Sequence, residues 1–83
     1  MKIYKAPNGK CNISGPVIRE YRELKDMSQE KLAAYLQLQG LDINQKAISR
    51  IETGDRVVPD YELSFFSEAL GVSIEALLQM NKE

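Results

Sequence analysis

Residues that favour the start or the end of a helix recur along this chain at short, regular intervals. Five candidate helix starts are Ser14-Gly15-Pro16, Ser28, Asn44, Pro59 and Ser73, and three glycines that can end a helix are Gly40, Gly54 and Gly71. Between them, apolar residues recur at the i, i+3, i+4 spacing of a helix with one buried face. No stretch alternates apolar and polar residues for long enough to build a sheet. The pattern therefore predicts an all-α domain of five short helices.

Each of the five stretches carries one apolar face. We expect the first helix over about residues 15–25 and the third over about residues 44–53. The residues expected to face the core are Val17, Ile18, Tyr21, Leu24 and Lys25 in the first stretch, Leu32, Ala33 and Leu36, with Gln39 as a further candidate, in the second, Ala47, Ile48 and Ile51 in the third, Leu63, Phe66, Ser67 and Leu70 in the fourth, and Ile74, Leu77 and Leu78 in the fifth. Faces of this size need a shared core, and an 83-residue chain has room for only one.

The first thirteen residues differ from the rest because they have no helical period. Pro7 and the turn pair Asn8-Gly9 predict an irregular N-terminal arm over residues 1–13, followed by one folded domain over residues 14–83. No apolar run approaches the ~20 residues that span a bilayer. The lysines near the start are not followed by the apolar stretch of a signal peptide. We therefore expect a cytoplasmic protein without a membrane segment.

The side chains that most enzymes depend on are scarce. The chain has no histidine, which removes the commonest general base and the commonest metal ligand. Cys11 is the only cysteine, so an internal disulfide and a multi-cysteine metal site are both excluded. Carboxylates remain, but a chain this short leaves little room for a substrate cleft. We expect no enzymatic activity, no bound metal and no cofactor.

Charge is distributed unevenly along the chain, although the net charge is only −1. Residues 1–25 carry six basic and two acidic side chains, whereas residues 55–83 carry two basic and six acidic ones. A protein that binds nucleic acid must neutralise phosphates, and it can do so with one basic surface even when its total charge is near zero. The distribution is compatible with such a surface.

The third predicted helix has a polar face that a protein core would not use. Gln45, Lys46, Ser49 and Arg50 lie opposite its apolar face. Glutamine can bind adenine with two hydrogen bonds, and lysine and arginine can bind guanine or a phosphate. An α-helix fits the DNA major groove, where its first residues reach the base edges. A solvated polar face is the simpler alternative.

Four segments in a fixed order give these observations a family context. SQEKLA and ISRIETG, preceded by IREYREL and followed by P…ELSFFSEALGVS, resemble the lambda-repressor-like, Cro-type (XRE-like) helix-turn-helix family over about residues 15–80. The resemblance implies a compact five-helix DNA-binding domain with an irregular N-terminal arm. One departure lies in the turn, because the chain takes seven steps from Leu36 to Ile43 where family members usually take two. The extra residues, within QLQGLD, lengthen the second helix or the connection between the second and third helices.

The resemblance also implies a role for individual residues. Gln29 matches a glutamine that touches phosphate and supports the third helix, although an ordinary exposed glutamine is the alternative. Arg22 and Glu52 match an ion pair that ties the first helix to the third, and we assign both to structure. The residues expected to contact DNA are Gln29, Asn44, Gln45, Lys46, Ser49, Arg50 and Arg56. Among these, Asn44 is mainly a helix cap, and for Arg56 in the following loop a merely solvated arginine is the alternative.

These features predict a sequence-specific, double-stranded-DNA-binding transcriptional regulator of bacterial or phage type, with repression as the favoured role. Because one module offers little contact area, we expect a homodimer that reads two half-sites about 34–36 Å apart. Phe65, Tyr61, Leu78 and Met80 are candidates for its interface. The alternative is a protein-interaction module on the same fold, antitoxin-like or anti-repressor, which the acidic C-terminal third favours weakly. No segment suggests a small-molecule effector.

Overall fold

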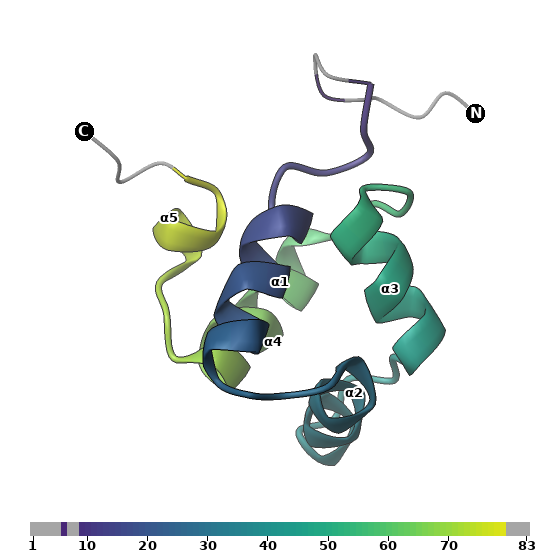
Figure 1. Ribbon diagram of the computed structural model, residues 1–83, viewed down its shortest axis with the longest axis vertical. Coiled ribbons are helices and arrows are strands. Elements are labelled where there is room, and N and C mark those ends of the chain that lie inside the picture. Colours follow the sequence, from purple (N-terminus) through teal and green to yellow (C-terminus); the bar gives the residue numbers. More distant parts are fainter. Residues whose placement is uncertain (1–5, 7–8, 80–83) are drawn as a thin grey trace.

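Five α-helices make up the computed structural model, which describes residue 6 and residues 9–79 (Figure 1). The helices are α1 (Gly15–Leu24), α2 (Gln29–Leu38), α3 (Gln45–Thr53), α4 (Asp60–Leu70) and α5 (Ile74–Leu77). No strand occurs in the described part of the chain. The predicted all-α, five-helix fold is therefore confirmed. Pro7 and Asn8 of the predicted arm, and Met80 of the predicted dimer interface, lie outside the described residues.

The helices surround one hydrophobic core. α1 packs against α3, α4 and α5, and α2 packs against α3 and α4. In Figure 1, α1 and α4 occupy the middle, with α3 on one side, α5 on the other and α2 below. Fully buried side chains from every helix meet between them, namely Ile18, Leu32, Leu36, Ile48, Ile51, Phe66, Leu70 and Leu77. Burial of this apolar surface is what holds helices of this length together, since none would be stable alone in water.

Side-chain caps start three of the helices where the sequence predicts. The Ser28 hydroxyl accepts from the Lys31 amide at 3.0 Å, and the Asn44 side chain accepts from the Ala47 amide at 2.8 Å. Ser73 caps α5 in the same way. α3 ends at Thr53, and the C-cap residue Gly54 has a φ of 85°, in the left-handed region that favours glycine.

Four residues predicted to face the core are exposed instead, and one of them is Gln39, at the C-cap of α2. Leu24 is 74% exposed, because α1 buries Ile18 and Arg22 and Leu24 lies about 200° around the helix from Arg22. Lys25 is also exposed, at the C-cap that follows α1. Ile74 is 38% exposed, and Leu77 is the residue of α5 that enters the core. A short helix buries only a narrow face, so an apolar residue of the helix does not necessarily lie on that buried face.

Both the helix and the turn absorb the extra residues between Leu36 and Ile43. α2 continues to Leu38, and Gly40 then reverses the chain with a φ of 104°. Leu41 and Ile43 return to the core, where both are buried. The connection is thus packed rather than looped out. α3 begins directly after it.

A membrane-spanning segment would need a long apolar helix. None of the helices in the described part of the chain has the length and apolar character to cross a bilayer.

Candidate nucleic-acid interface

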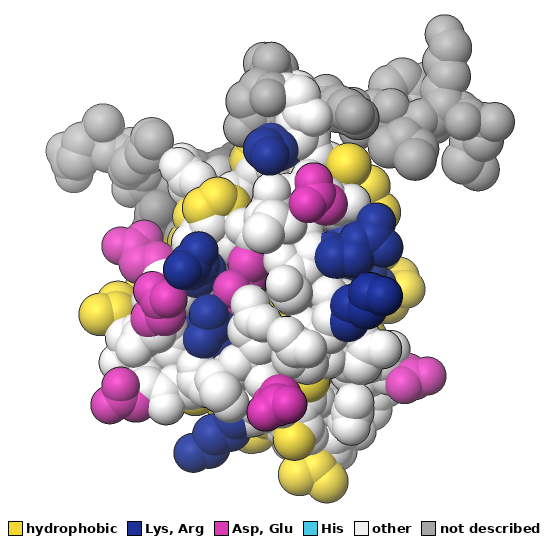
Figure 2. Space-filling model, turned by 45° about the vertical axis from the view of Figure 1, so that its right-hand side comes forward, with side chains coloured by type: hydrophobic (Ala, Val, Ile, Leu, Met, Phe, Trp, Pro, Cys, Tyr) yellow, Lys and Arg dark blue, Asp and Glu magenta, His cyan; other side chains and the backbone are white. Residues whose placement is uncertain are grey.

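α3 separates its side chains into a buried face and a polar outer face. Ile48 and Ile51 are fully buried. On the outer side, Gln45, Lys46 and Arg50 are exposed and Ser49 is half-buried. In Figure 2, where the right-hand side of Figure 1 with α3 comes forward, Lys and Arg side chains adjoin at the right of the view, and others are spread over the face among Asp and Glu side chains. We call Gln45, Lys46, Ser49 and Arg50 the polar face of α3.

A buried ion pair fixes α3 against α1. The Arg22 Nε donates to Glu52 Oε2 at 2.7 Å, and the second contact, from Nη2 to Oε1, is 3.0 Å long. Arg22 also donates from Nη1 to the Met27 carbonyl at 2.6 Å. The hydrogen bonds to Glu52 raise the pKa of the Arg22 guanidinium above its usual value, so the arginine stays charged. Such a bidentate pair fixes the relative orientation of the two side chains and strengthens the interaction between them.

Gln29 and Gln45 extend this ion pair to the surface. The Gln29 side-chain amide donates to Glu52 Oε1 at 2.9 Å, and its oxygen accepts from the Gln45 amide at 2.6 Å. A continuous chain of hydrogen bonds therefore runs from Arg22 through Glu52 and Gln29 to Gln45. The Gln45 amide bonds to Gln29 through one proton, which leaves one acceptor and one donor of this side chain at the exposed start of α3.

The cations of the polar face have no carboxylate partner within the described residues. Arg50 donates from Nη2 to the Asp55 carbonyl at 3.3 Å, a contact just beyond the end of its own helix. Lys46 lies one turn earlier and is exposed. Residues four apart lie on the same side of a helix, so the two charges form one basic strip.

Arg56 has an intramolecular partner that was not predicted. Its guanidinium binds Glu62 through two contacts, Nη1 to Oε1 at 2.7 Å and Nη2 to Oε2 at 3.1 Å. The Glu62 side chain is buried, and its hydrogen bonds raise the pKa of Arg56. The pair joins the α3–α4 loop to the first turn of α4. Glu62 precedes the buried Phe66 by four residues, so the two lie on the same face of α4, and that spacing was the sequence signal for this inward carboxylate.

The elements that carry this geometry lie within a known family. A helix-turn-helix family model matches residues 18–77, from the middle of α1 to the end of α5. The chain belongs to the XRE/lambda-repressor-like helix-turn-helix family. Comparisons with curated proteins and with solved structures found no match.

In this helix-turn-helix domain, α2 and α3 are the two helices of the motif. The chain is therefore a DNA-binding protein of the type that regulates transcription. Proteins of this family are not typically enzymes. The resemblance found in the sequence is thereby confirmed. The contacts of individual residues with DNA stay predictions.

The segment before α1 makes contacts that sequence reasoning missed. Asn12 bonds to residues of α1, α3 and the α3–α4 loop, and the Cys11 amide donates to the Gly54 carbonyl at 2.8 Å. The end of the predicted arm is therefore fixed to the helix-turn-helix domain. Asn12 precedes Gly15 by three residues, the same spacing as the three side-chain caps, and that spacing was the available signal.

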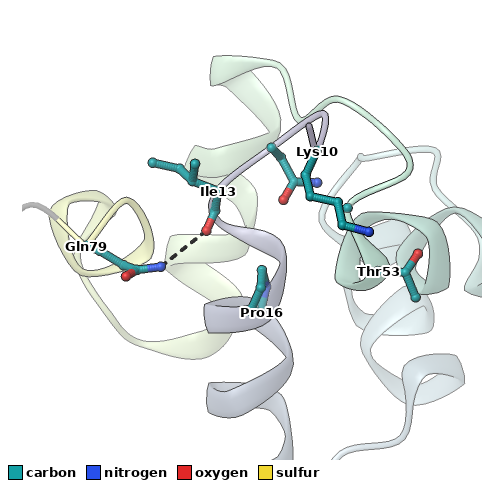
Figure 3. A pocket seen from close by; sticks show the side chains of 7 residues that line it. Lys10, Ile13, Pro16, Thr53 and Gln79 are labelled. Atoms are coloured by element: carbon teal, nitrogen blue, oxygen red, sulfur yellow. Dashed lines mark hydrogen bonds between the residues drawn. The ribbon is translucent and has the colours of Figure 1, made fainter. Parts of the chain in front are cut away.

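A pocket of about 400 Å³ opens beside this segment (Figure 3). Its lining comes from the pre-α1 segment, the start of α1, the end of α3 and the residues after α5, with Lys10, Ile13, Pro16, Thr53 and Gln79 labelled in the figure. It lies at the C-terminal end of α3, whereas Gln45 is at the N-terminal end. The pocket is thus separate from the start of the polar face.

Proposed function

We propose that this helix-turn-helix protein is a sequence-specific transcriptional repressor that inserts α3 into the major groove of double-stranded DNA. The observation that carries the proposal is the hydrogen-bonded chain from Glu52 through Gln29 to Gln45. A glutamine that is already oriented loses less conformational freedom when it binds a base. Its remaining acceptor and donor match the pattern that adenine presents in the major groove.

The rest of the proposed contact surface surrounds Gln45. Lys46 and Arg50 would bind guanine or the phosphates beside it, and Ser49 lies between them on the same helix. Asn44 and Gln29 stand at the N-terminal ends of α3 and α2, where backbone amides favour an anion such as phosphate. Arg56 would reach the DNA backbone from the loop while it stays paired with Glu62.

The proposed repressor acts as a homodimer in the cytoplasm of a bacterium, encoded by the cell or by a phage. Two copies of α3 would read half-sites about one helical turn apart. Tyr61 is exposed on α4, and Phe65 and Leu78 are half-buried. These residues remain the candidates for the dimer interface. We propose no small-molecule effector.

Selection of bound sequences from random duplex DNA tests the proposal. The wild type should enrich a roughly palindromic site, and Gln45→Ala should relax the preference at the same position of each half-site. Gln39→Ala is the matched control, because it removes an exposed amide from the C-cap of α2. It should leave the enriched site unchanged.

Failure to enrich any duplex would contradict the proposal and favour the protein-interaction module. The six acidic side chains of residues 55–83 are the feature that supports this second function. A protein partner captured with little dependence on salt would then be expected, whereas DNA binding weakens steeply as salt is added.

A further inference from the structure

We infer that Asn12 is a positioning residue for α3, which holds the C-terminal end of this helix in the orientation that base recognition requires. The inference rests on the proposed function. It concerns a residue outside the stretch that the helix-turn-helix family model matches.

One side chain joins the start of α1 to the last turn of α3 and the loop after it, which lie 39 and 44 residues further along the chain. The Asn12 amide donates to the Ile51 carbonyl in the last turn of α3 at 3.0 Å, and to the Arg56 carbonyl in the α3–α4 loop at 2.7 Å. Its oxygen accepts from the Gly15 amide at 2.8 Å, at the start of α1. Both amide protons and the oxygen are therefore used. An amide that is satisfied in this way specifies one arrangement of its partners.

The backbone around Asn12 fits closely against the same end of α3. A Cβ atom on Gly15 would overlap the Ile51 carbonyl oxygen, so only glycine allows α1 to start this near to α3. The Cys11 amide binds the Gly54 carbonyl, and the aliphatic part of Lys10 lies over Gly54. The segment before α1 thus covers the end of α3.

α3 is consequently held at both ends by different means. The hydrogen bond from Gln45 to Gln29 holds the start, and the last turn is held by the Arg22–Glu52 ion pair together with the Asn12 hydrogen bonds. A nine-residue helix is about 13 Å long. Without Asn12, the last turn keeps the Arg22–Glu52 ion pair but loses the hydrogen bond that holds the Ile51 carbonyl. The last turn can then shift while Gln45 stays bonded to Gln29, and the side chains nearest to this turn would move most. Removal of the Asn12 side chain should therefore disturb the bases next to Ser49 and Arg50 more than the base next to Gln45.

The test compares three purified variants with the wild type in the same random-duplex selection and in binding titrations. Asn12→Ala removes all three side-chain hydrogen bonds. In Asn12→Ser, the serine side chain is too short to reach the carbonyls of both Ile51 and Arg56. This variant replaces Asn12→Ala in the test if the alanine variant does not fold. Ile13→Ala is the matched control, because Figure 3 shows the Ile13 side chain pointing away from α3. All titrations are done below the unfolding temperature of the least stable variant.

Asn12→Ala should reduce the ratio of specific to non-specific binding about tenfold, which is the scale of one or two hydrogen bonds. The preference should relax at the positions read by Ser49 and Arg50, while the position read by Gln45 and the affinity for scrambled DNA stay unchanged. A purely structural role would lower the melting temperature without altering the base preferences of the folded protein.

The outcomes separate the two proposals. If the wild type selects a site and the Asn12 variants select the same one with an unchanged ratio, the positioning role is wrong and the proposed function stands. If the wild type selects no site, the proposed function fails and the positioning role fails with it.

Discussion

At the scale of single residues, Glu52 is the centre of the hydrogen-bonded chain. Its side chain is 3% exposed and accepts from Arg22 and from Gln29. Removal of one partner from a buried pair leaves an uncompensated charge, at a cost of about 3–5 kcal/mol, whereas apolar replacement of both can cost little. We predict that Arg22→Met and Glu52→Met each lower the free energy of unfolding by about this amount.

The double variant, Arg22→Met with Glu52→Met, should be destabilised by less than the sum of the two single effects. Urea unfolding followed by circular dichroism measures all three values under the same conditions. Strictly additive effects would mean that the pair does not act as a unit.

Gln29 is predicted to act on DNA through Gln45. Gln29→Ala should weaken binding to the selected site about tenfold, because it frees the Gln45 side chain to adopt other rotamers. Once Gln45 is alanine, the same change should have a much smaller effect. A double-mutant cycle in DNA binding measures this coupling, and equal effects of Gln29→Ala in both backgrounds would show that the two glutamines act independently.

At the scale of helices and turns, the connection between α2 and α3 supplies a matched pair of leucines. Leu41 is 7% exposed and Leu38 is 84% exposed. Leu41→Ala should therefore cost about 2–3 kcal/mol of unfolding free energy, and Leu38→Ala should stay within about 0.5 kcal/mol of the wild type. Chemical denaturation checks both. Similar, small effects would mean that the longer connection contributes nothing to the core.

Two glycines should respond differently to a methyl group. Gly15→Ala places a Cβ atom against the Ile51 carbonyl, and we expect the forced displacement of α1 to cost about 1–3 kcal/mol or more. Gly40 has open space around it but a φ of 104°, so Gly40→Ala should cost about 1–2 kcal/mol from backbone strain alone.

The readout that separates the two is the DNA-binding specificity of the folded variants. Gly15→Ala should alter the base preference near Arg50, since it forces the start of α1 and the end of α3 apart. Gly40→Ala should lower the melting temperature and leave that preference intact. The reverse pattern would contradict the close contact between α1 and α3.

Sequence reasoning reached the helices and the polar face because both depend on local signals. Caps such as Ser28 and Asn44 and the apolar spacing of α3 act within one or two turns of helix. Asn12 bonds locally to Gly15, but its other two partners are 39 and 44 residues away, and no local rule encodes those contacts. Leu24 shows that local spacing can also mislead. It is apolar and follows Tyr21 by three residues, so it was predicted to be buried, but it lies on the exposed side of α1.

At the scale of the whole molecule, three of the arginines bind carboxylates, whereas Lys46 and Arg50 bind none within the described residues. Basic charge is thus available on α3, although the net charge is −1. The logarithm of the DNA-binding constant should fall linearly with the logarithm of the salt concentration. Replacement of Lys46 or Arg50 by alanine should make this slope shallower by about one for each phosphate that the side chain neutralises.

Arg19→Ala is the control for this experiment, because Arg19 is paired with Glu23 on α1. It should leave the slope unchanged. Fluorescence anisotropy at several salt concentrations gives the slopes, and an equal effect of all three substitutions would indicate attraction by net charge instead of contact by α3.

The polar face of α3 is the surface on which the proposed DNA binding depends. A titration of ¹⁵N-labelled protein with its selected duplex, followed by NMR, tests this most directly, because backbone and side-chain amides report each contact separately. We predict the largest shifts at Gln45, Lys46, Ser49 and Arg50 and at the side-chain amide of Gln29. Shifts confined to α4 and α5, with α3 unchanged, would contradict the proposed role of α3.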